Sequence, residues 1–317
     1  MRIGVLNNLR AGRSKAQISR VLSLLKRHPD VVHVETDSGN DVATALAALA
    51  DHQVDVLAVN GGDGTLQRTL TDVLSTDLFK SPPLIVPLRG GRTNMSALDI
   101  GNRSSPVTAL AALVTAARNG SLEKKIVERA VLRVDIIPDR IVQYGMSFGV
   151  GVIPRAIELT HSLFPYGRAQ GVFGSGVVIG TLITRAAFNT TDGILTPDRI
   201  AIRLDDQPVE QEEFHLVIAT TLDRLFLKIR PFWGQETAPV RLTAIAAGVS
   251  RSPIAAIRIL RGRSPTAVPD PSYMSRNVHH AELSLDCGLT VDGEMFAPQP
   301  GRIVHITADH RTRFVRI

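Results

Sequence analysis

The chain has 317 residues, 44% hydrophobic and 21% charged, so it is long enough for two domains and too apolar to be disordered as a whole. Lys and Arg outnumber Asp and Glu by 36 to 30, which points to nucleotide, nucleic acid or anionic lipid as a phosphate-bearing partner, or reflects a mere bias in composition. No apolar run approaches the roughly 20 residues of a membrane-spanning helix. The single cysteine, Cys287, excludes an intrachain disulfide and a cysteine-rich metal site. Together with an amino end that does not resemble a signal peptide, it predicts a cytoplasmic protein.

The first third alternates strands and helices. Buried-type apolar runs predict strands, and apolar residues at helical spacing predict helices. The expected strands are Arg2–Asn8, Val31–Thr36, Val54–Val59 and Leu84–Val86, and the expected helices are Ser14–Arg27, Asn40–Asp51, Thr65–Leu74 and Met95–Ile100. This order predicts a doubly wound α/β domain over residues 1–122, with a parallel sheet covered on both faces. Ligands of such sheets bind at the carboxyl ends of the strands.

From about residue 125 the pattern changes to short β-type runs between turn residues. The expected strands are Ala130–Ile137, Ile141–Phe148, Arg199–Leu204, Phe214–Ala219, Val240–Ala246, Ala255–Leu260, Ala281–Leu285, Arg302–Thr307 and Arg313–Ile317. They predict a second domain over residues 123–317, an antiparallel β-sandwich with a helical insertion from about Arg155 to Ala187. In a variant of this prediction, the last residues of the chain pack against the first domain.

A glycine-rich loop, Gly61–Thr65, follows the third strand and has the sequence Gly-Gly-Asp-Gly-Thr. Its glycines allow a ligand to approach the backbone closely, and the following helix directs free N–H groups at the loop. The loop is therefore suited to a polyphosphate. Asp63 would repel phosphate unless a cation or a proton transfer involves it, which implies Mg²⁺. The alternative is a tight turn in which Asp63 caps the helix.

A second loop, Pro87–Asn94, follows the fourth strand and leads into another short helix. Because neighbouring strands end at the same edge of a sheet, the two loops are expected to form one crevice. Arg89 and Arg92 either reach phosphate oxygens there or remain solvated. Far downstream stands Asp292-Gly293-Glu294, which taken alone indicates only a hairpin turn.

These elements occur in the order found in the diacylglycerol-kinase-like lipid kinases, a family that includes sphingosine, ceramide and bacterial lipid kinases. The chain resembles this family from its first strand to its last. Asn8–Gly12 stands where the family has an Asn-Pro-x-Ser-Gly loop, and Thr36 stands where it keeps a nucleotide-contacting threonine. The glycine motif is shared with NAD kinases and phosphofructokinases, whereas the late Asp-Gly-Glu narrows the resemblance to lipid kinases.

The resemblance implies an ATP- and Mg²⁺-dependent kinase acting on the hydroxyl of diacylglycerol or of a ceramide-type or sphingoid lipid. It implies that Glu294 is the general base, and that Asp63 organises Mg²⁺ and phosphates or shares the base role. The residues implied to bind ATP are Asn8, Gly12, Thr36, Gly61, Gly62, Gly64, Thr65, Gln67, Thr93 and Asn94. A lipid partner at the inner membrane face is implied, and a nucleic-acid partner is not.

The chain departs from the family at several positions. Met95 stands where many members have Asp, and Gln67 and Arg68 stand where members usually have Asn and Glu. The segment Pro231–Val240 lacks the acidic pair that holds a structural Mg²⁺ in some bacterial members, so that ion is not expected. Two alternatives stay open: an NAD kinase, and a nucleotide- or lipid-binding protein without turnover.

Two surfaces have more than one interpretation. Arg258, Arg261 and Arg263, with arginines near the carboxyl end, either form a basic face for anionic lipid headgroups or are scattered and solvated. The apolar segment Leu159–Ile183 is either the lip of a lipid pocket, an interfacial helix, β-domain core or a homodimer contact.

Overall fold

The computed structural model describes residues 1–10, 15–37, 41–163, 193–249, 252–268 and 270–317. It divides into two compact units, Met1–Ala130 together with Arg311–Ile317, and Val131–His310. Two long strands, β5 (Ile126–Ile137) and β16 (Arg302–Val315), run from one unit into the other. The predicted site residue Gly12, and most of the predicted apolar segment Leu159–Ile183, lie outside the described residues.

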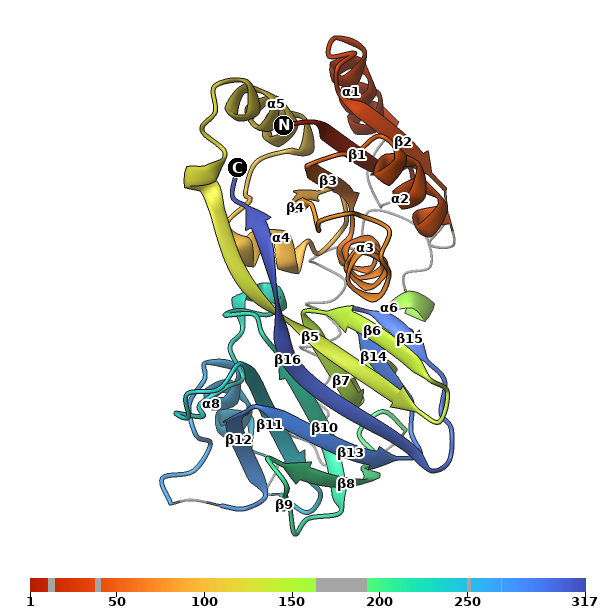
Figure 1. Ribbon diagram of the computed structural model, residues 1–317. Coiled ribbons are helices and arrows are strands. Elements are labelled where there is room, and N and C mark those ends of the chain that lie inside the picture. Colours follow the sequence, from red (N-terminus) through yellow and green to blue (C-terminus); the bar gives the residue numbers. More distant parts are fainter. Residues whose placement is uncertain (11–14, 38–40, 164–192, 250–251, 269) are drawn as a thin grey trace. The chain divides into compact units, whose positions relative to one another are not determined.

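The first unit contains a parallel sheet with the strand order β4-β3-β1-β2, as Figure 1 shows. The strands are β1 (Ile3–Asn8), β2 (Val32–Thr36), β3 (Val56–Gly61) and β4 (Leu84–Arg89). Asn8 pairs with Thr36, and Gly61 pairs with Arg89. These registers bring the carboxyl ends of the four strands to one edge of the sheet.

Helices cover both faces of this sheet. Buried leucines and valines of α1 (Lys15–Lys26) and α5 (Pro106–Arg118) pack with Ile3 and Val5 of β1 in one apolar core. On the other face, α2 (Val42–Asp51) and α3 (Asp63–Ser75) contact each other and the strands. The sheet is therefore doubly wound, as predicted.

Helix α5 was not among the predicted elements, although its start carries a recognisable signal. Ser105 is the N-cap residue, its hydroxyl accepts a hydrogen bond from the backbone N–H of Thr108 at 3.2 Å, and Pro106 occupies the first helical position. The short helix α4 (Met95–Ile100) has the predicted bounds.

The carboxyl end of the chain completes the first unit. Phe314 of β16 pairs in parallel with Ile85 of β4. The side-chain amide of Asn102 donates to the carbonyls of Pro87 and Val315, at 3.0 and 3.1 Å, while its oxygen accepts from the backbone N–H of Ile317. One buried amide thus fastens the last residues beside the end of β4.

The second unit is built from antiparallel strand pairs, with helix α6 (Val152–Leu163) directly after β7. Its strands include β6 (Ile141–Gly145), β7 (Ser147–Gly151), β8 (Asp198–Leu204), β9 (Gln207–Pro208), β10 (Glu213–Thr220), β11 (Val240–Ala246), β12 (Tyr273–Val278), β13 (His280–Leu285), β14 (Leu289–Val291) and β15 (Glu294–Phe296). Strand β10 pairs with β7, β8 and β11, and β14 pairs with β7 and β15. A parallel sheet in one unit and antiparallel strands in the other confirm the predicted combination of an α/β half and a β half.

Three strand predictions were wrong in detail. The segment predicted as the strand Ala255–Leu260 is the helix α8 (Pro253–Leu260), with Pro253 in its first turn and buried residues four apart at Ala255 and Ile259. The run Ile141–Phe148 is divided between β6 and β7, which belong to different strand pairs. The two predicted carboxyl-terminal strands form the single strand β16.

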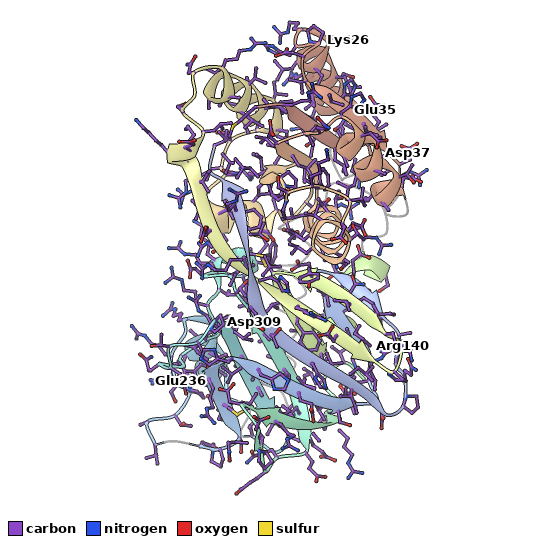
Figure 2. The ribbon with its side chains drawn as sticks, in the orientation of Figure 1. Lys26, Glu35, Asp37, Arg140, Glu236 and Asp309 are labelled. Atoms are coloured by element: carbon purple, nitrogen blue, oxygen red, sulfur yellow. The ribbon has the colours of Figure 1, made fainter. Side chains whose placement is uncertain are left out.

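Both units bury apolar side chains and leave charged ones at their surfaces. Figure 2 shows Lys26, Glu35 and Arg140 at the periphery of the units to which they belong. In the part of the chain that the structure describes, no helix has both the length and the apolar character needed to cross a membrane.

Candidate active site

Two glycine-containing loops touch each other at the carboxyl edge of the parallel sheet. The first joins β3 to α3, and the second joins β4 to α4. A Cβ built on Gly90 would lie 2.6 Å from the backbone nitrogen of Gly61, and one on Gly91 would overlap the Cα of Gly62. The two loops therefore lie backbone against backbone, an approach that requires the absence of side chains at these positions.

The carboxylate of Asp63 ties the two loops together. Asp63 is the first residue of α3, and its carboxylate accepts hydrogen bonds from the hydroxyl of Thr93 at 2.7 Å and from the backbone N–H groups of Met95 and Ser96 at 3.0 Å each. It therefore caps the amino end of the neighbouring helix α4 rather than its own helix. This arrangement differs from the alternative in which Asp63 caps its own helix.

Asn94 fixes the shape of the second loop. Its backbone adopts a left-handed conformation with φ of 52°, and its side chain exchanges two hydrogen bonds with the backbone of Gly91. The Gly91 N–H donates to Oδ1 at 2.7 Å, and Nδ2 donates to the Gly91 carbonyl at 2.8 Å. The side chain of Asn94 is thus a structural brace of the loop.

The ends of β1 and β2 join the same edge. The side-chain amide of Asn8 donates to the Thr65 hydroxyl at 2.9 Å, while its oxygen accepts from the backbone N–H of Arg10. The backbone N–H of Leu9 donates to the carbonyl of Thr36 at 2.9 Å. The structure thereby brings three of the predicted ATP-binding residues, Asn8, Thr36 and Thr65, to one side of the sheet.

Several buried polar atoms at this edge have no hydrogen-bond partner among the described residues. They are Nδ2 of Asn7, Oδ1 of Asn60, Oγ1 of Thr36 and Oγ of Ser96. Asn7 and Asn60 face each other on β1 and β3, and Asn60 donates to Asn7 at 2.6 Å. Buried polar atoms usually find partners. The four atoms lie at the carboxyl ends of β1, β2 and β3 and in the first turn of α4, beside the glycine loops.

The remaining predicted residues of the first unit have different surroundings. The side-chain amide of Gln67 is buried and donates to the Thr71 hydroxyl at 3.0 Å, one helical turn away. Gly64 is half-buried in the first turn of α3. Arg89 donates to the carbonyl of Arg103, whereas Arg92 is exposed. Of the two loop arginines, Arg92 is the one whose side chain faces solvent.

In the second unit, Asp292 and Gly293 form the two-residue turn between β14 and β15. Both have positive φ, 48° and 92°, and Val291 pairs with Glu294 across the turn. This is the geometry of a type I′ hairpin, which Asp-Gly strongly favours. The prediction of a hairpin turn at Asp292-Gly293-Glu294 is therefore correct. The turn fixes the backbone position of Glu294, the first residue of β15.

The carboxylate of Asp292 anchors this hairpin to the start of β7. It accepts hydrogen bonds from the backbone N–H groups of Met146 and Ser147, at 2.7 and 2.9 Å, and from the Ser147 hydroxyl at 2.7 Å. A Cβ on Gly145 would lie 2.8 Å from Oδ2 of Asp292, so only glycine fits there without displacing it. Asp292 is thus a positioning residue for the hairpin.

Glu294 lies directly beyond the turn, with its side chain exposed. No hydrogen bond or ion pair joins it to any residue in the described ranges. A carboxylate without protein partners, on a hairpin that is itself anchored, is free to accept a proton from a bound molecule.

The acidic residues of these two regions offer little for a resident metal ion. Within the described residues, no cluster of three or more His, Cys, Asp or Glu side chains could hold a metal. Three donors already occupy the Asp63 carboxylate, so one acceptor position remains on its Oδ1. One carboxylate contact still fits Mg²⁺ bound chiefly by phosphate oxygens and water, which is its usual mode beside nucleotides.

The sequence alone did not reveal several residues of the loop edge and of the hairpin. Asn7, Asn60 and Gly91 were not among the predicted site residues, and Asp292 was not assigned its anchoring role. A polar residue that closes an otherwise apolar strand, as Asn7 and Asn60 do, is the signal that could have revealed the amide pair. No local signal in the sequence indicates that Gly91 touches Gly62, because the contact joins separate loops.

The chain is similar to known proteins in the sequence of its first unit and in its fold. Residues 2–122 match the family model of the diacylglycerol kinase catalytic domain. A solved diacylglycerol kinase from Bacillus anthracis str. Sterne is 14% identical, with a TM-score of 0.62, and the match covers 99% of this chain and 96% of that one. Yeast NADH kinase, solved in complex with NADH, is 11% identical, with a TM-score of 0.53, and the match covers 100% of this chain and 84% of that one. At these identities the structural likeness shows the fold alone. No curated protein matches the chain in sequence.

Residues 2–122 resemble the diacylglycerol kinase catalytic domain in sequence, and the chain as a whole shares the fold of the solved diacylglycerol kinase and of NADH kinase.

Proposed function

We propose that the chain is an ATP-dependent lipid kinase that phosphorylates the hydroxyl group of a neutral lipid alcohol, diacylglycerol or a ceramide-type or sphingoid lipid, at the inner face of a membrane. The observation that carries this proposal is the pair of touching glycine loops, Gly61–Thr65 and Gly90–Asn94, braced by the Asp63 carboxylate. The match to a kinase family supports the reaction class. The Asp292-Gly293 hairpin that presents Glu294 supports a hydroxyl acceptor.

In this proposal, the phosphates of ATP lie against the glycine loops. Helix α3 begins at Asp63 directly after Gly62, so its first backbone N–H groups and the positive end of its dipole face the loop. Gly62 leaves room for an anion because it has no side chain. Arg92, with its exposed guanidinium, is available to neutralise phosphate charge.

The proposed chemical step is an in-line phosphoryl transfer. The acceptor hydroxyl oxygen forms a bond to the γ-phosphorus, the bond from that phosphorus to the β,γ-bridging oxygen breaks, and ADP leaves. The hydroxyl proton passes to the carboxylate of Glu294. Asp63 is assigned to positioning, because two backbone N–H groups and one hydroxyl already occupy its oxygens. Such reactions depend on positioning and charge neutralisation more than on covalent catalysis.

A magnesium ion would be held by the ATP phosphates, with at most one carboxylate contact from Asp63. When bound, Mg²⁺ supplies charge neutralisation for the phosphates. The protein's own contribution is to hold the loops, keep Thr93 and Met95 against Asp63, and present Glu294 to the acceptor.

The test is a transfer assay with radiolabelled ATP and Mg²⁺. Mixed micelles offer diacylglycerol, ceramide or a sphingoid base in separate reactions, and a detergent-free reaction offers NAD. The matched control enzyme is Glu294→Gln, which changes one exposed side chain that has no partner among the described residues. The proposal is supported if one lipid becomes labelled and the Glu294→Gln enzyme incorporates less label into it. That lipid is then the acceptor.

Two results would overturn it. Label in NAD alone would assign the chain to the soluble-acceptor branch of the superfamily. Binding of ATP in a calorimetric titration, without label in any acceptor, would identify a nucleotide-binding protein without lipid kinase activity.

A further inference from the structure

Helix α8 in the second unit exposes a stripe of mixed apolar and basic side chains. Ile254 and Ile257 are 70% and 45% exposed, and Arg258 and Arg261 are also exposed. These four residues are spaced i, i+3, i+4 and i+7, which places them along one face of the helix. The opposite stripe, Ala255 and Ile259, is buried. The helix is thus held by one face and offers isoleucine beside arginine on the other.

A neighbouring loop extends this stripe. The backbone N–H of Arg230 donates to the carbonyl of Leu260 at 3.0 Å, and a Cβ on Gly262 would lie 2.7 Å from the carbonyl oxygen of Arg230. The loop that ends at Arg230 therefore lies directly beside the carboxyl end of α8. Its tip carries Leu227, which is 42% exposed and has a positive φ of 56°.

The two segments are basic throughout. Residues 224–232 contain three basic and no acidic side chains, and so do residues 253–268. Together the two segments carry six basic and no acidic side chains. Basic side chains therefore lie next to three exposed aliphatic side chains, Leu227, Ile254 and Ile257.

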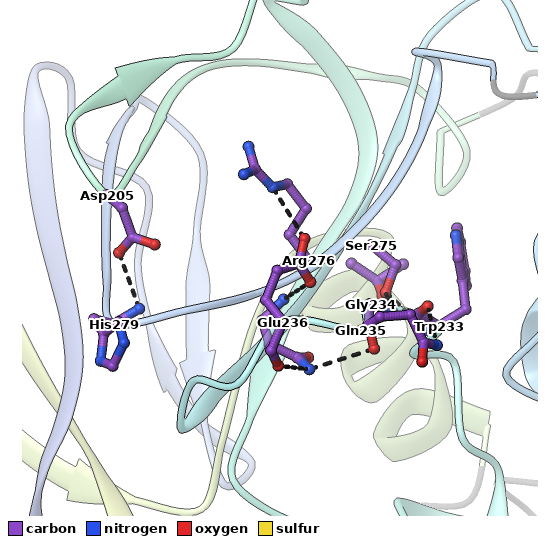
Figure 3. A network of polar contacts seen from close by, with 10 residues as sticks. Asp205, Trp233, Gly234, Gln235, Glu236, Ser275, Arg276 and His279 are labelled. Carbon is purple, nitrogen blue, oxygen red and sulfur yellow. Dashed lines mark hydrogen bonds and ion pairs between the residues drawn. The ribbon is translucent and has the colours of Figure 1, made fainter.

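The acidic residue that follows the loop, Glu236, is paired. Figure 3 shows Glu236 against β12, where its carboxylate accepts hydrogen bonds from the backbone N–H of Asn277 at 3.0 Å and from the Arg276 guanidinium at 3.4 Å. Partial burial opposes its ionisation, but these hydrogen bonds outweigh that effect and hold the pKa of Glu236 below its usual value. Its charge is compensated by Arg276. The two carboxylates that flank the basic segments also have partners: Asp223 pairs with Arg241 at 2.9 Å, and Asp270 accepts a hydrogen bond from the backbone N–H of Ser272 at 2.9 Å.

We propose that Leu227, Arg230, Ile254, Ile257, Arg261 and Arg263 form a membrane-docking surface that binds an anionic lipid bilayer. Isoleucine and leucine side chains at the periphery of a basic helix enter the boundary between headgroups and acyl chains, while arginines contact lipid phosphates. A nucleic-acid partner would not call for the three exposed aliphatic side chains. The surface deepens the proposed lipid kinase function, since the acceptor lipid lies in such a bilayer, but its binding can be measured without turnover.

The experiment is flotation of the full chain with vesicles of phosphatidylcholine alone or of equal parts phosphatidylcholine and phosphatidylglycerol. One variant, Arg261→Gln with Arg263→Gln, removes two exposed charges whose side chains make no hydrogen bond to another described residue. A second, Ile254→Asn with Ile257→Asn, removes the apolar stripe. The matched control is Arg140→Gln with Ile303→Asn, which changes an exposed arginine and an exposed isoleucine elsewhere in the same unit.

The wild-type chain and the control are expected to float with anionic vesicles and to bind neutral ones much more weakly. The arginine variant is expected to bind anionic vesicles about 30-fold more weakly, from about fivefold per arginine. High salt should reproduce part of that loss, because the Debye length falls from about 10 Å at 0.1 M to about 3 Å at 1 M. The isoleucine variant is expected to lose at least about tenfold in affinity.

Equal flotation of all four proteins, or no flotation of the wild type, would overturn the proposal. Light scattering tests whether a second copy of the chain occupies this surface instead. If the wild type is a dimer and the isoleucine variant is a monomer, the surface is a dimer contact. If vesicle binding follows the surface as expected while no lipid is phosphorylated, the docking surface stands and the proposed reaction fails.

Discussion

Gly91 lies so close to Gly62 that a Cβ on Gly91 would overlap the Gly62 Cα, whereas a Cβ on Gly62 would stay 3.4 Å from the Gly91 Cα. The contact is therefore asymmetric. A methyl group at position 91 must push two backbones apart, while one at position 62 is accommodated at ordinary contact distance. The two alanine substitutions should therefore have different effects: Gly91→Ala on the stability of the loops, and Gly62→Ala on the proposed ligand contact.

The first prediction follows from this asymmetry. Gly91→Ala should lower the free energy of unfolding by about 1–3 kcal/mol, the usual cost of overpacking, as measured by urea denaturation. Gly62→Ala should leave the unfolding midpoint nearly unchanged but weaken ATP binding about tenfold, equivalent to about 1.4 kcal/mol, as measured by calorimetric titration. Wild-type ATP affinity in a folded Gly62→Ala protein would contradict the proposed approach of phosphate to Gly62.

The second prediction concerns the brace between the loops. Asp63→Asn leaves one acceptor oxygen where the carboxylate had two, so the hydroxyl of Thr93 or a backbone N–H of α4 loses its partner. The expected loss of stability is about 1–3 kcal/mol, measured by denaturation, with a parallel fall in turnover. Asp77→Asn is the control, because Asp77 is exposed and has no partner among the described residues. Equal stability of both variants would show that the Asp63 hydrogen bonds contribute nothing to the fold.

The third prediction separates the two acidic residues of the hairpin. Glu294→Gln should lower turnover by roughly 10²–10⁴-fold, the usual contribution of a positioned base, without affecting stability or ATP affinity. Asp292→Asn should lower both turnover and stability, because it disturbs the hydrogen bonds to Met146 and Ser147. Steady-state kinetics and thermal unfolding distinguish the two effects, with Glu210→Gln as an exposed control. Unchanged turnover in Glu294→Gln would end its assignment as the base.

The fourth prediction concerns the single cysteine. Burial, together with the nearby charge of Asp198, raises the pKa of the Cys287 thiol from 9.0 to about 11. Since the thiolate is the reactive form, Cys287 should react with iodoacetamide at pH 8 about a hundredfold more slowly in the native protein than in urea. As the pH rises, the thiol loses its proton at a lower pH in the unfolded chain than in the native protein. Ionisation of Cys287 therefore lowers the free energy of unfolding between about pH 9 and pH 11 and has no effect on it well below pH 9. Equal alkylation rates with and without urea would contradict this environment for Cys287.

The regular part of the fold follows from local patterns. The alternation of buried strands and amphipathic helices up to Ile100 was predicted to within a few residues, because each element is determined by its own periodicity. The short helix α8 was mistaken for a strand, since its apolar run from Ala255 to Leu260 fits either period. The signal that distinguishes the two is the proline at its start, and a short run offers little else.

The site was predictable in its motifs and not in its contacts. Glycine loops, the Asp-Gly turn and the polar ends of strands are local features, and the structure contains them. The partners of Asp63 lie about 30 residues away in the sequence, and those of Asp292 lie about 145 away. The tertiary fold determines which hydrogen-bond donors lie next to a carboxylate. The positioning roles of the Asp63 and Asp292 carboxylates could therefore be recognised only in the structure.

The hydrogen bonds from Thr93, Met95 and Ser96 to Asp63 have a consequence for how the loops would receive ATP. Both loops are fixed to a single carboxylate between two strands that are themselves paired, so their conformational entropy is lost when the protein folds. In the proposed complex, a nucleotide would meet a preorganised surface, and little of its binding energy would be consumed in ordering the backbone. If ATP binds at this edge as proposed, its recognition should be closer to lock-and-key than to induced fit.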